Sequence, residues 1–102
     1  MAHTVVTEFT KPSEEIVFFV MPQSHIDAVN QIISEIGDKH IQSQISKFGN
    51  KITVARQFID EAAYQEFAEK RSVNVDISKA RSDMEEYNKI FGITSITYVE
   101  LN

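Results

Sequence analysis

The 102-residue sequence contains no cysteine and no tryptophan, and it has only two prolines and three glycines. Because cysteine is absent, the chain can form neither a disulfide framework nor a thiolate metal site. The three histidines (His3, His25 and His40) do not have the spacing of metal-ligand pairs such as HxH, HxxxH or HExxH. Glycine-rich phosphate-binding patterns are absent as well. We therefore expect no metal site and no bound cofactor.

Long apolar runs and clusters of basic residues are absent too. The longest apolar run covers residues 16–21, whereas a helix that spans a bilayer needs roughly 20 apolar residues. The net charge is −5, and the ten lysines and arginines are scattered along the chain. Nucleic-acid backbones and anionic lipid surfaces both require a concentrated basic surface. We therefore expect a cytoplasmic protein that binds neither nucleic acid nor membranes.

The residues that are present predict an ordinary globular domain. Hydrophobic residues make up 42% of the sequence and charged residues 25%, which is typical of folded proteins. At this length we expect a single domain over residues 1–102. No group stands out as a nucleophile with a neighbouring base, and no acidic pair can be singled out for acid–base catalysis.

Residues 41–59 have the pattern of a β-hairpin. Gly49 and Asn50 lie between two runs of alternating apolar and polar residues, and both residue types tolerate the positive φ of a type II′ or I′ turn. A turn at this position places most apolar side chains of the two strands on one face of the hairpin. The side chain of Arg56 lies on the same face. The expected pairs on this face are Ile41 with Phe58, Ser43 with Arg56, Ile45 with Val54 and Lys47 with Ile52.

Two further segments have the composition of strands. Residues 16–21, IVFFVM, form a continuous apolar run that is typical of a strand buried on both faces. Residues 3–9 also favour a strand, but Pro12 follows them, so we expect residues 1–12 to form an edge strand or an N-terminal arm. The remaining pattern predicts helices over residues 24–36, 60–71 and 77–91 and a last strand over residues 93–101.

Apart from the arm, these elements follow the order βαββαβ when the last two helices are counted as one crossover. This is the ferredoxin-like plan, an α+β fold in which right-handed crossovers place the helices on one face of a four-stranded antiparallel sheet. The other face of a strand at residues 16–21 would then be apolar and uncovered. We therefore predict a homodimer in which two sheets pack face to face.

The element order and the segment ARQFIDEAAYQEF together resemble the dimeric α+β barrel superfamily, which includes the antibiotic-biosynthesis-monooxygenase-like proteins. In that family the third strand commonly ends in tryptophan, and a histidine follows nine residues later on the next helix. Here Phe58 and Phe67 occupy those positions, and residues 16–21 lack the asparagine that haem-degrading members carry on the first strand. The resemblance implies a dimeric α/β barrel without the polar groups of the family's oxygenase and haem chemistry.

Arg56 is the residue that most suggests a ligand. Its planar guanidinium can bind both oxygens of a carboxylate, and a buried charge needs a partner, which is either an acid of this chain or a ligand. Aromatic side chains between the sheet and the helices would line an apolar pocket or, alternatively, fill a core. The predicted ligand-binding residues are Arg56, Phe18, Phe58, Tyr64, Phe67 and Tyr98.

Three functions remain as alternatives. The first is a non-catalytic dimer that binds an apolar or amphipathic acid, such as a fatty acid or an aromatic acid, with its carboxylate at Arg56. The second is a cofactor-independent oxygenase or isomerase of the dimeric α+β barrel type, in which Arg56, Tyr64 and Tyr98 orient the substrate and handle protons. The third is a structural dimer without a ligand, whose N-terminal arm (1–12) exchanges between subunits or adds a strand to a partner.

Overall fold

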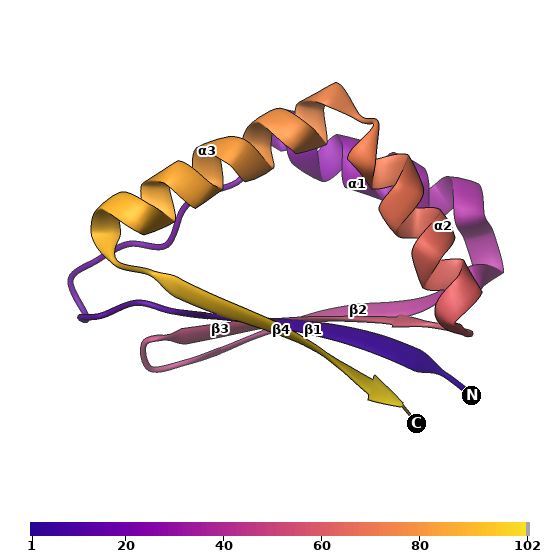
Figure 1. Cartoon of the computed structure of the whole chain (residues 1–102), viewed down its shortest axis with the longest axis horizontal. Helices are drawn as coiled ribbons and strands as arrows, with labels where there is room; N and C mark the ends of the chain where they lie inside the picture. Colours follow the sequence, from indigo (N-terminus) through magenta and orange to yellow (C-terminus); the bar gives the residue numbers. More distant parts are fainter. Residues whose placement is uncertain (102) are drawn as a thin grey trace.

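The chain folds into one sheet covered on one side by helices. A computed structural model describes residues 1–101. The elements are β1 (His3–Thr10), α1 (Gln23–Ile36), a short 3-10 helix η1 (Gly37–Lys39), β2 (His40–Phe48), β3 (Lys51–Phe58), α2 (Glu61–Ser72), α3 (Val75–Phe91) and β4 (Thr94–Leu101). The four strands pair antiparallel in the order β2-β3-β1-β4, and the helices form a layer over one face (Figure 1). The ferredoxin-like βαββαβ plan predicted from the sequence is confirmed.

The first strand of the sheet, however, is formed by residues 3–10 and not by residues 16–21. Residues 3–10, which were predicted as an edge strand or arm, form β1 in the centre of the sheet, between β3 and β4. Residues 16–21, which were predicted as the central strand, form neither helix nor strand. The prediction for both segments was wrong. The physical reason is that residues 3–10 have a partner strand on each side, so their backbone N–H and C=O groups form the hydrogen bonds of the sheet.

The apolar run at 16–21 is instead held against α3 by side chains. The ring of Phe19 lies 5.5 Å from that of Tyr87 in an edge-on arrangement, and the Tyr87 hydroxyl donates a hydrogen bond to the carbonyl of Val17. The ammonium group of Lys11 donates to the carbonyl of Ile16 at 2.7 Å. These contacts replace a strand ladder for two of the segment's carbonyl groups and keep Phe19 half-buried.

The hairpin has the predicted turn and nearly the predicted register. Gly49 has a φ of 58° while Asn50 has a negative φ, which fits a type II′ turn and excludes type I′. Ser43 lies opposite Arg56, as predicted. The pairing of Ile41 with Phe58 was wrong, because a bulge before Gln42 places His40 opposite Phe58 instead.

The hydrophobic core lies where α1, α2 and the start of α3 meet the end of β3. Side-chain caps fix the two later helices, since Asp60 accepts a hydrogen bond from the amide of Ala63 and Asn74 accepts one from the amide of Ile77. The largest fully buried side chains belong to Phe58, Phe67 and Ile77. The complete cluster comprises Val29, Ile32, Ile36, Phe58, Ala63, Phe67 and Ile77.

The helix layer covers the sheet unevenly. Val99 pairs with Val5, and Val5 pairs with Arg56, so all three side chains point to the helix-covered face. Even so, Val99 is 49% exposed and Leu101 on the same face of β4 is 63% exposed. The helix-covered face of the sheet is therefore fully buried at the end of β3, where Phe58 lies, and open along β4. None of the helices in the described part of the chain is both long and apolar enough to cross a membrane.

Candidate functional site

Arg56 lies on the helix-covered face of β3, two residues before the buried end of the strand. Its Nη1 donates a hydrogen bond to the hydroxyl of Ser43 at 3.0 Å, and its Cζ lies 5.6 Å from the ring centroid of Phe67. Burial lowers the pKa of Arg56, and the positive charge of Arg71 lowers it further. Both effects show that the guanidinium sits in a place that is unfavourable for a cation.

A second arginine approaches the same aromatic ring from the helix layer. Arg71 is in the last turn of α2, and its Cζ lies 5.3 Å from the ring centroid of Phe67. Burial lowers the pKa of Arg71, with a further contribution from the charge of Arg81. The neighbouring Tyr64 raises the pKa of Arg71 and so opposes the shifts that burial and like charge produce. Two guanidinium groups thus share one ring, to which each is attracted by a cation–π interaction.

His25 and Arg81 complete a group of basic side chains. His25 lies in the first turn of α1, and its Nδ1 is buried without a hydrogen-bond partner among residues 1–101. Burial lowers the pKa of His25, and the charges of Arg56, Arg81 and Arg71 all lower it further. The imidazole is therefore neutral near pH 7. We call Arg56, Arg71, Arg81 and His25 the arginine cluster.

No carboxylate within residues 1–101 neutralises the arginine cluster. The sequence has fifteen acidic residues and only three arginines. The salt bridges of the described residues all use lysines: Lys39 with Glu66, Lys51 with Glu8, Lys70 with Glu35 and Lys79 with Asp83. Partly buried cations without counter-ions are unfavourable, so this cluster is suited to an anion from outside the chain.

Four of the six predicted site residues come together here. Phe58 lies 5.3 Å from Phe67 and 5.5 Å from Tyr64, measured between ring centroids, and Arg56 lies over Phe67. Phe58 and Phe67 are each 0% exposed, so they form the floor beneath the charges and cannot touch a ligand themselves. The four residues therefore combine a filled core with a cationic surface above it.

The structure places the other two predicted residues elsewhere. Phe18 lies beside the ammonium groups of Lys11 and Lys47, at 5.3 and 6.0 Å from the ring centroid. Tyr98 points to the opposite face of the sheet, where its hydroxyl donates to Glu8 at 2.7 Å. Phe18 is displaced because residues 16–21 are not a strand. Tyr98 is displaced because the register of β4 pairs it with Val6, whose side chain points away from the helices, and not with Val5, which pairs with Arg56.

Sequence reasoning missed three members of the arginine cluster, although a signal was present. Arg71 follows the buried Phe67 by four residues, and Arg81 follows the buried Ile77 by four. His25 precedes the buried Val29 by the same interval. Residues four apart share one face of a helix. Each of these polar side chains could thus have been placed on the same helix face as a buried residue from its spacing.

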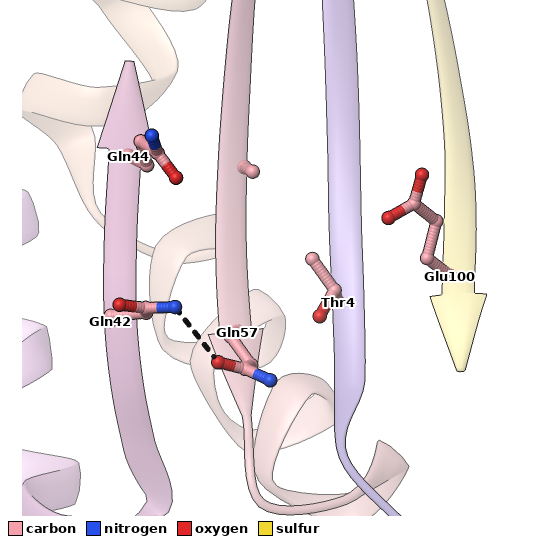
Figure 2. Close-up of a pocket in the computed structure, with 6 residues that line it drawn as sticks. Thr4, Gln42, Gln44, Gln57 and Glu100 are labelled. Atoms are coloured by element: carbon pink, nitrogen blue, oxygen red, sulfur yellow. Dashed lines mark hydrogen bonds between the residues drawn. The ribbon is translucent and has the colours of Figure 1, made fainter. Parts of the chain in front are cut away.

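The helix-free face of the sheet carries a different, polar surface. A shallow hollow of about 170 Å³ is lined by Thr4, Gln42, Gln44, Ala55, Gln57 and Glu100. Figure 2 shows these side chains on all four strands, with the amide of Gln42 donating to the amide oxygen of Gln57 at 3.2 Å.

The same face of the sheet carries Glu8 on β1. Hydrogen bonds from Lys51 and Tyr98 lower the pKa of the Glu8 carboxyl. Within residues 1–101 no group of three histidine, aspartate or glutamate side chains could hold a metal ion.

The sequence matches no known family model, and no curated protein is similar to it in sequence. Solved structures are similar in fold. Rv0793 from Mycobacterium tuberculosis has a TM-score of 0.58 at 9% identity, over 100% of this chain and 95% of that one. A dimeric ferredoxin-like protein from an uncultured marine organism has a TM-score of 0.56 at 13% identity, over 98% and 93%.

SnoaB, a cofactor-independent oxygenase from Streptomyces nogalater, has a TM-score of 0.54 at 9% identity, over 99% of this chain and 92% of that one. The chain shares the ferredoxin-like α+β fold of these proteins. The ferredoxin-like α+β fold that the sequence predicted is thereby confirmed. At such low identity the similarity carries no information about which side chains act.

Proposed function

We propose that the protein is a homodimer that binds a small organic acid between its sheet and its helix layer, with the acid group at Arg56. The observation that carries this proposal is the half-buried guanidinium of Arg56, which has a hydroxyl and an aromatic ring as neighbours but no carboxylate within residues 1–101. Arginine binds carboxylates through two parallel hydrogen bonds. The acid group of a ligand is the partner that this position lacks.

The apolar part of such a ligand has a surface available next to Arg56. One row across the sheet runs from Ser43 through Arg56 to Val5 and Val99. Val99 and Leu101 remain exposed on the helix-covered face, beyond the reach of the core. An amphipathic acid can therefore place its carboxylate at Arg56 and cover Val5 and Val99 with its tail.

Binding of matched compounds tests this proposal. We expect decanoate and a long-chain aromatic carboxylate to raise the melting temperature of the purified protein, and decanol, which lacks the charge, to raise it less. Arg56→Gln removes the charge and should abolish the difference between decanoate and decanol. Native mass spectrometry should detect the bound acid in the unmodified protein. If no acid binds, or if Arg56→Gln binds decanoate as well as the unmodified protein does, the proposal is wrong.

The interface of the proposed homodimer differs from the one that the sequence predicted. The apolar run at 16–21 lies beside α3 and cannot supply the face between two sheets. Instead the helix-free face carries Phe48, which is 89% exposed, and Ile96, which is 61% exposed. Exposed apolar side chains on one sheet face favour packing against a second sheet. Light scattering should give twice the chain mass, and Ile96→Lys should lower it to that of a monomer.

An enzymatic function is the second candidate, and one feature of the arginine cluster favours it. A neutral histidine with an unpartnered nitrogen can accept a proton from carbon, and adjacent cations stabilise the carbanion that forms. His25 has these properties, and the charges of Arg56, Arg81 and Arg71 act on its imidazole. If the protein catalyses such a step, it should exchange the α-protons of a bound keto acid for deuterium, and His25→Gln should stop the exchange. Exchange no faster than in buffer would exclude it.

A further inference from the structure

We propose that the ligand of this site carries two negative charges, and that Arg71, Arg81 and His25 bind the second one. The chemical class is a small dianion, either a dicarboxylate or a phosphate monoester. This inference rests on the proposed function and specifies its substrate class. It also divides the arginine cluster into Arg56, which binds any acid group, and three residues that select for a second charge.

The number of unneutralised charges is the first reason. All three arginines of the chain contribute to the cluster, and within residues 1–101 none of them has a carboxylate partner. A monoanion would neutralise one guanidinium and leave two cations close together. Like charges in a partly buried place repel each other more strongly than in water. A second negative charge on the same ligand removes that repulsion.

The geometry provides the second reason, because the guanidinium groups of Arg56 and Arg71 meet over one ring from two separate elements, and the members of the cluster belong to four. Arg56 lies on β3, Arg71 at the end of α2, Arg81 on α3 and His25 at the start of α1. The Cζ atoms of Arg56 and Arg71 lie 5.6 and 5.3 Å from the ring centroid of Phe67, which is itself immobile in the core. Two guanidinium groups held at a fixed spacing can each bind one acid group of a rigid ligand.

His25 is the third reason. Its buried Nδ1 has no hydrogen-bond partner among residues 1–101, which is rare for a buried polar atom. The charged groups that act on it are Arg56 from the sheet, Arg71 from α2 and Arg81 from α3, and no acid is among them. An anion placed between these arginines would supply the missing partner, and its negative charge would favour the protonated imidazole.

Access from solvent is compatible with this role. Arg81 is exposed on α3, whereas Arg56 and Arg71 are half-buried. Arg81 is therefore the arginine of the cluster that solvent reaches most easily, and Arg56 is more sheltered. A ligand whose first acid group reaches Arg56 would leave its second acid group toward Arg71, Arg81 and His25.

The test compares ligands that differ only in the number of charges. Isothermal titration calorimetry would measure hexanoate against adipate, benzoate against phthalate, and phenyl phosphate as the phosphate monoester. We expect a dianion to bind about tenfold or more tightly than its monoanion partner. Arg81→Gln should reduce that advantage, because one of the cations that bind the second acid group is lost. Arg56→Gln should weaken the binding of every compound.

Lys79→Gln provides the matched control, because Lys79 lies on the same helix as Arg81 but is exposed and paired with Asp83. It should leave the preference for dianions unchanged, and circular dichroism should show all variants folded. Equal affinities for monoanions and dianions, with binding that still depends on Arg56, would overturn this inference and leave the proposed function intact. If no acid binds at all, the proposed function itself fails. If adipate and phthalate fail where phenyl phosphate succeeds, the dianion is a phosphate ester.

Discussion

The two ends of the space between sheet and helices differ in what fills them. At the end near α2, Phe58 and Phe67 pack against each other and are fully buried. Next to them, the guanidinium groups of Arg56 and Arg71 lie over the ring of Phe67, and Val99 on β4 stays half exposed. Phe58 and Arg56 lie on the same face of one strand, only two residues apart. Strand β3 thus contributes Phe58 to a filled core and, two residues earlier, Arg56 to a cluster of cations that has no carboxylate partner within residues 1–101.

This difference has a structural cause in the position of the helices. α2 contacts β3 through Phe67, whereas β4 is exposed along its whole length. A sheet face without a helix over it cannot complete a core. We expect the chain to gain most of its stability at the end where Phe58 and Phe67 pack, and the proposed ligand would bind at the other end.

Removal of the ring that separates the two ends should have the largest effect. Phe67→Ala should lower the free energy of unfolding by about 3–5 kcal/mol, because the side chain is fully buried and leaves a cavity. Urea denaturation followed by circular dichroism measures this change. Val73→Ala, at a side chain that is 79% exposed, should change it by less than about 0.5 kcal/mol. Similar losses in the two variants would mean that α2 does not form the core.

The segment at 16–21 should make an intermediate contribution. Phe19→Ala should cost about 1–2 kcal/mol, since the half-buried ring packs edge-on against Tyr87. Hydrogen exchange gives an independent measurement, because the amides of β1 should be protected and those of residues 17–20 should exchange rapidly. Strong protection at residues 17–20 would restore the strand that the sequence pattern favours at this place.

Arg56 should contribute little to stability, in contrast to its neighbour Phe58. Arg56→Met should change the free energy of unfolding of the ligand-free protein by less than about 1 kcal/mol, in either direction. The reason is that the variant removes a partly buried cation without a counter-ion and keeps most of the apolar stem. Thermal denaturation without ligand measures this. A loss comparable to that of Phe67→Ala would assign Arg56 to the core rather than to a binding site.

The smallest effect should come from the helix-free face. Lys51 and Tyr98 lower the pKa of Glu8 below its usual value of 4.5. A carboxyl group whose pKa is lowered by folding stabilises the protein above the unfolded pKa, and this contribution is lost as the pH falls through the folded pKa. Glu8→Gln should therefore lower the melting temperature slightly at pH 7. The difference should shrink below pH 4.5, and a difference that is constant with pH would contradict this explanation.

Much of the fold followed from local patterns. Gly49 and the alternation on both sides of it predicted the hairpin and the pairing of Ser43 with Arg56, because the turn and the side-chain faces constrain the same register. The bulge that moves His40 opposite Phe58 left no comparable signal. The same alternation placed the charged side chain of Arg56 on the apolar face of the hairpin, and this made Arg56 a candidate for binding a ligand. The rest of the arginine cluster was not predicted, although its spacing to buried residues was visible in each helix.

The sequence by itself determined the turn and most of the register of the hairpin, and the positions of the helices, because these depend on residues within a few positions of one another. Tertiary structure decided which of two strand-like segments entered the sheet. Residues 3–10 and 16–21 both suit a strand, and the choice depended on partner strands and on the surface of α3, which lie far away in the sequence. Tertiary structure also brought residues 25, 56, 71 and 81 together, because a shared charge environment arises only when separate elements pack.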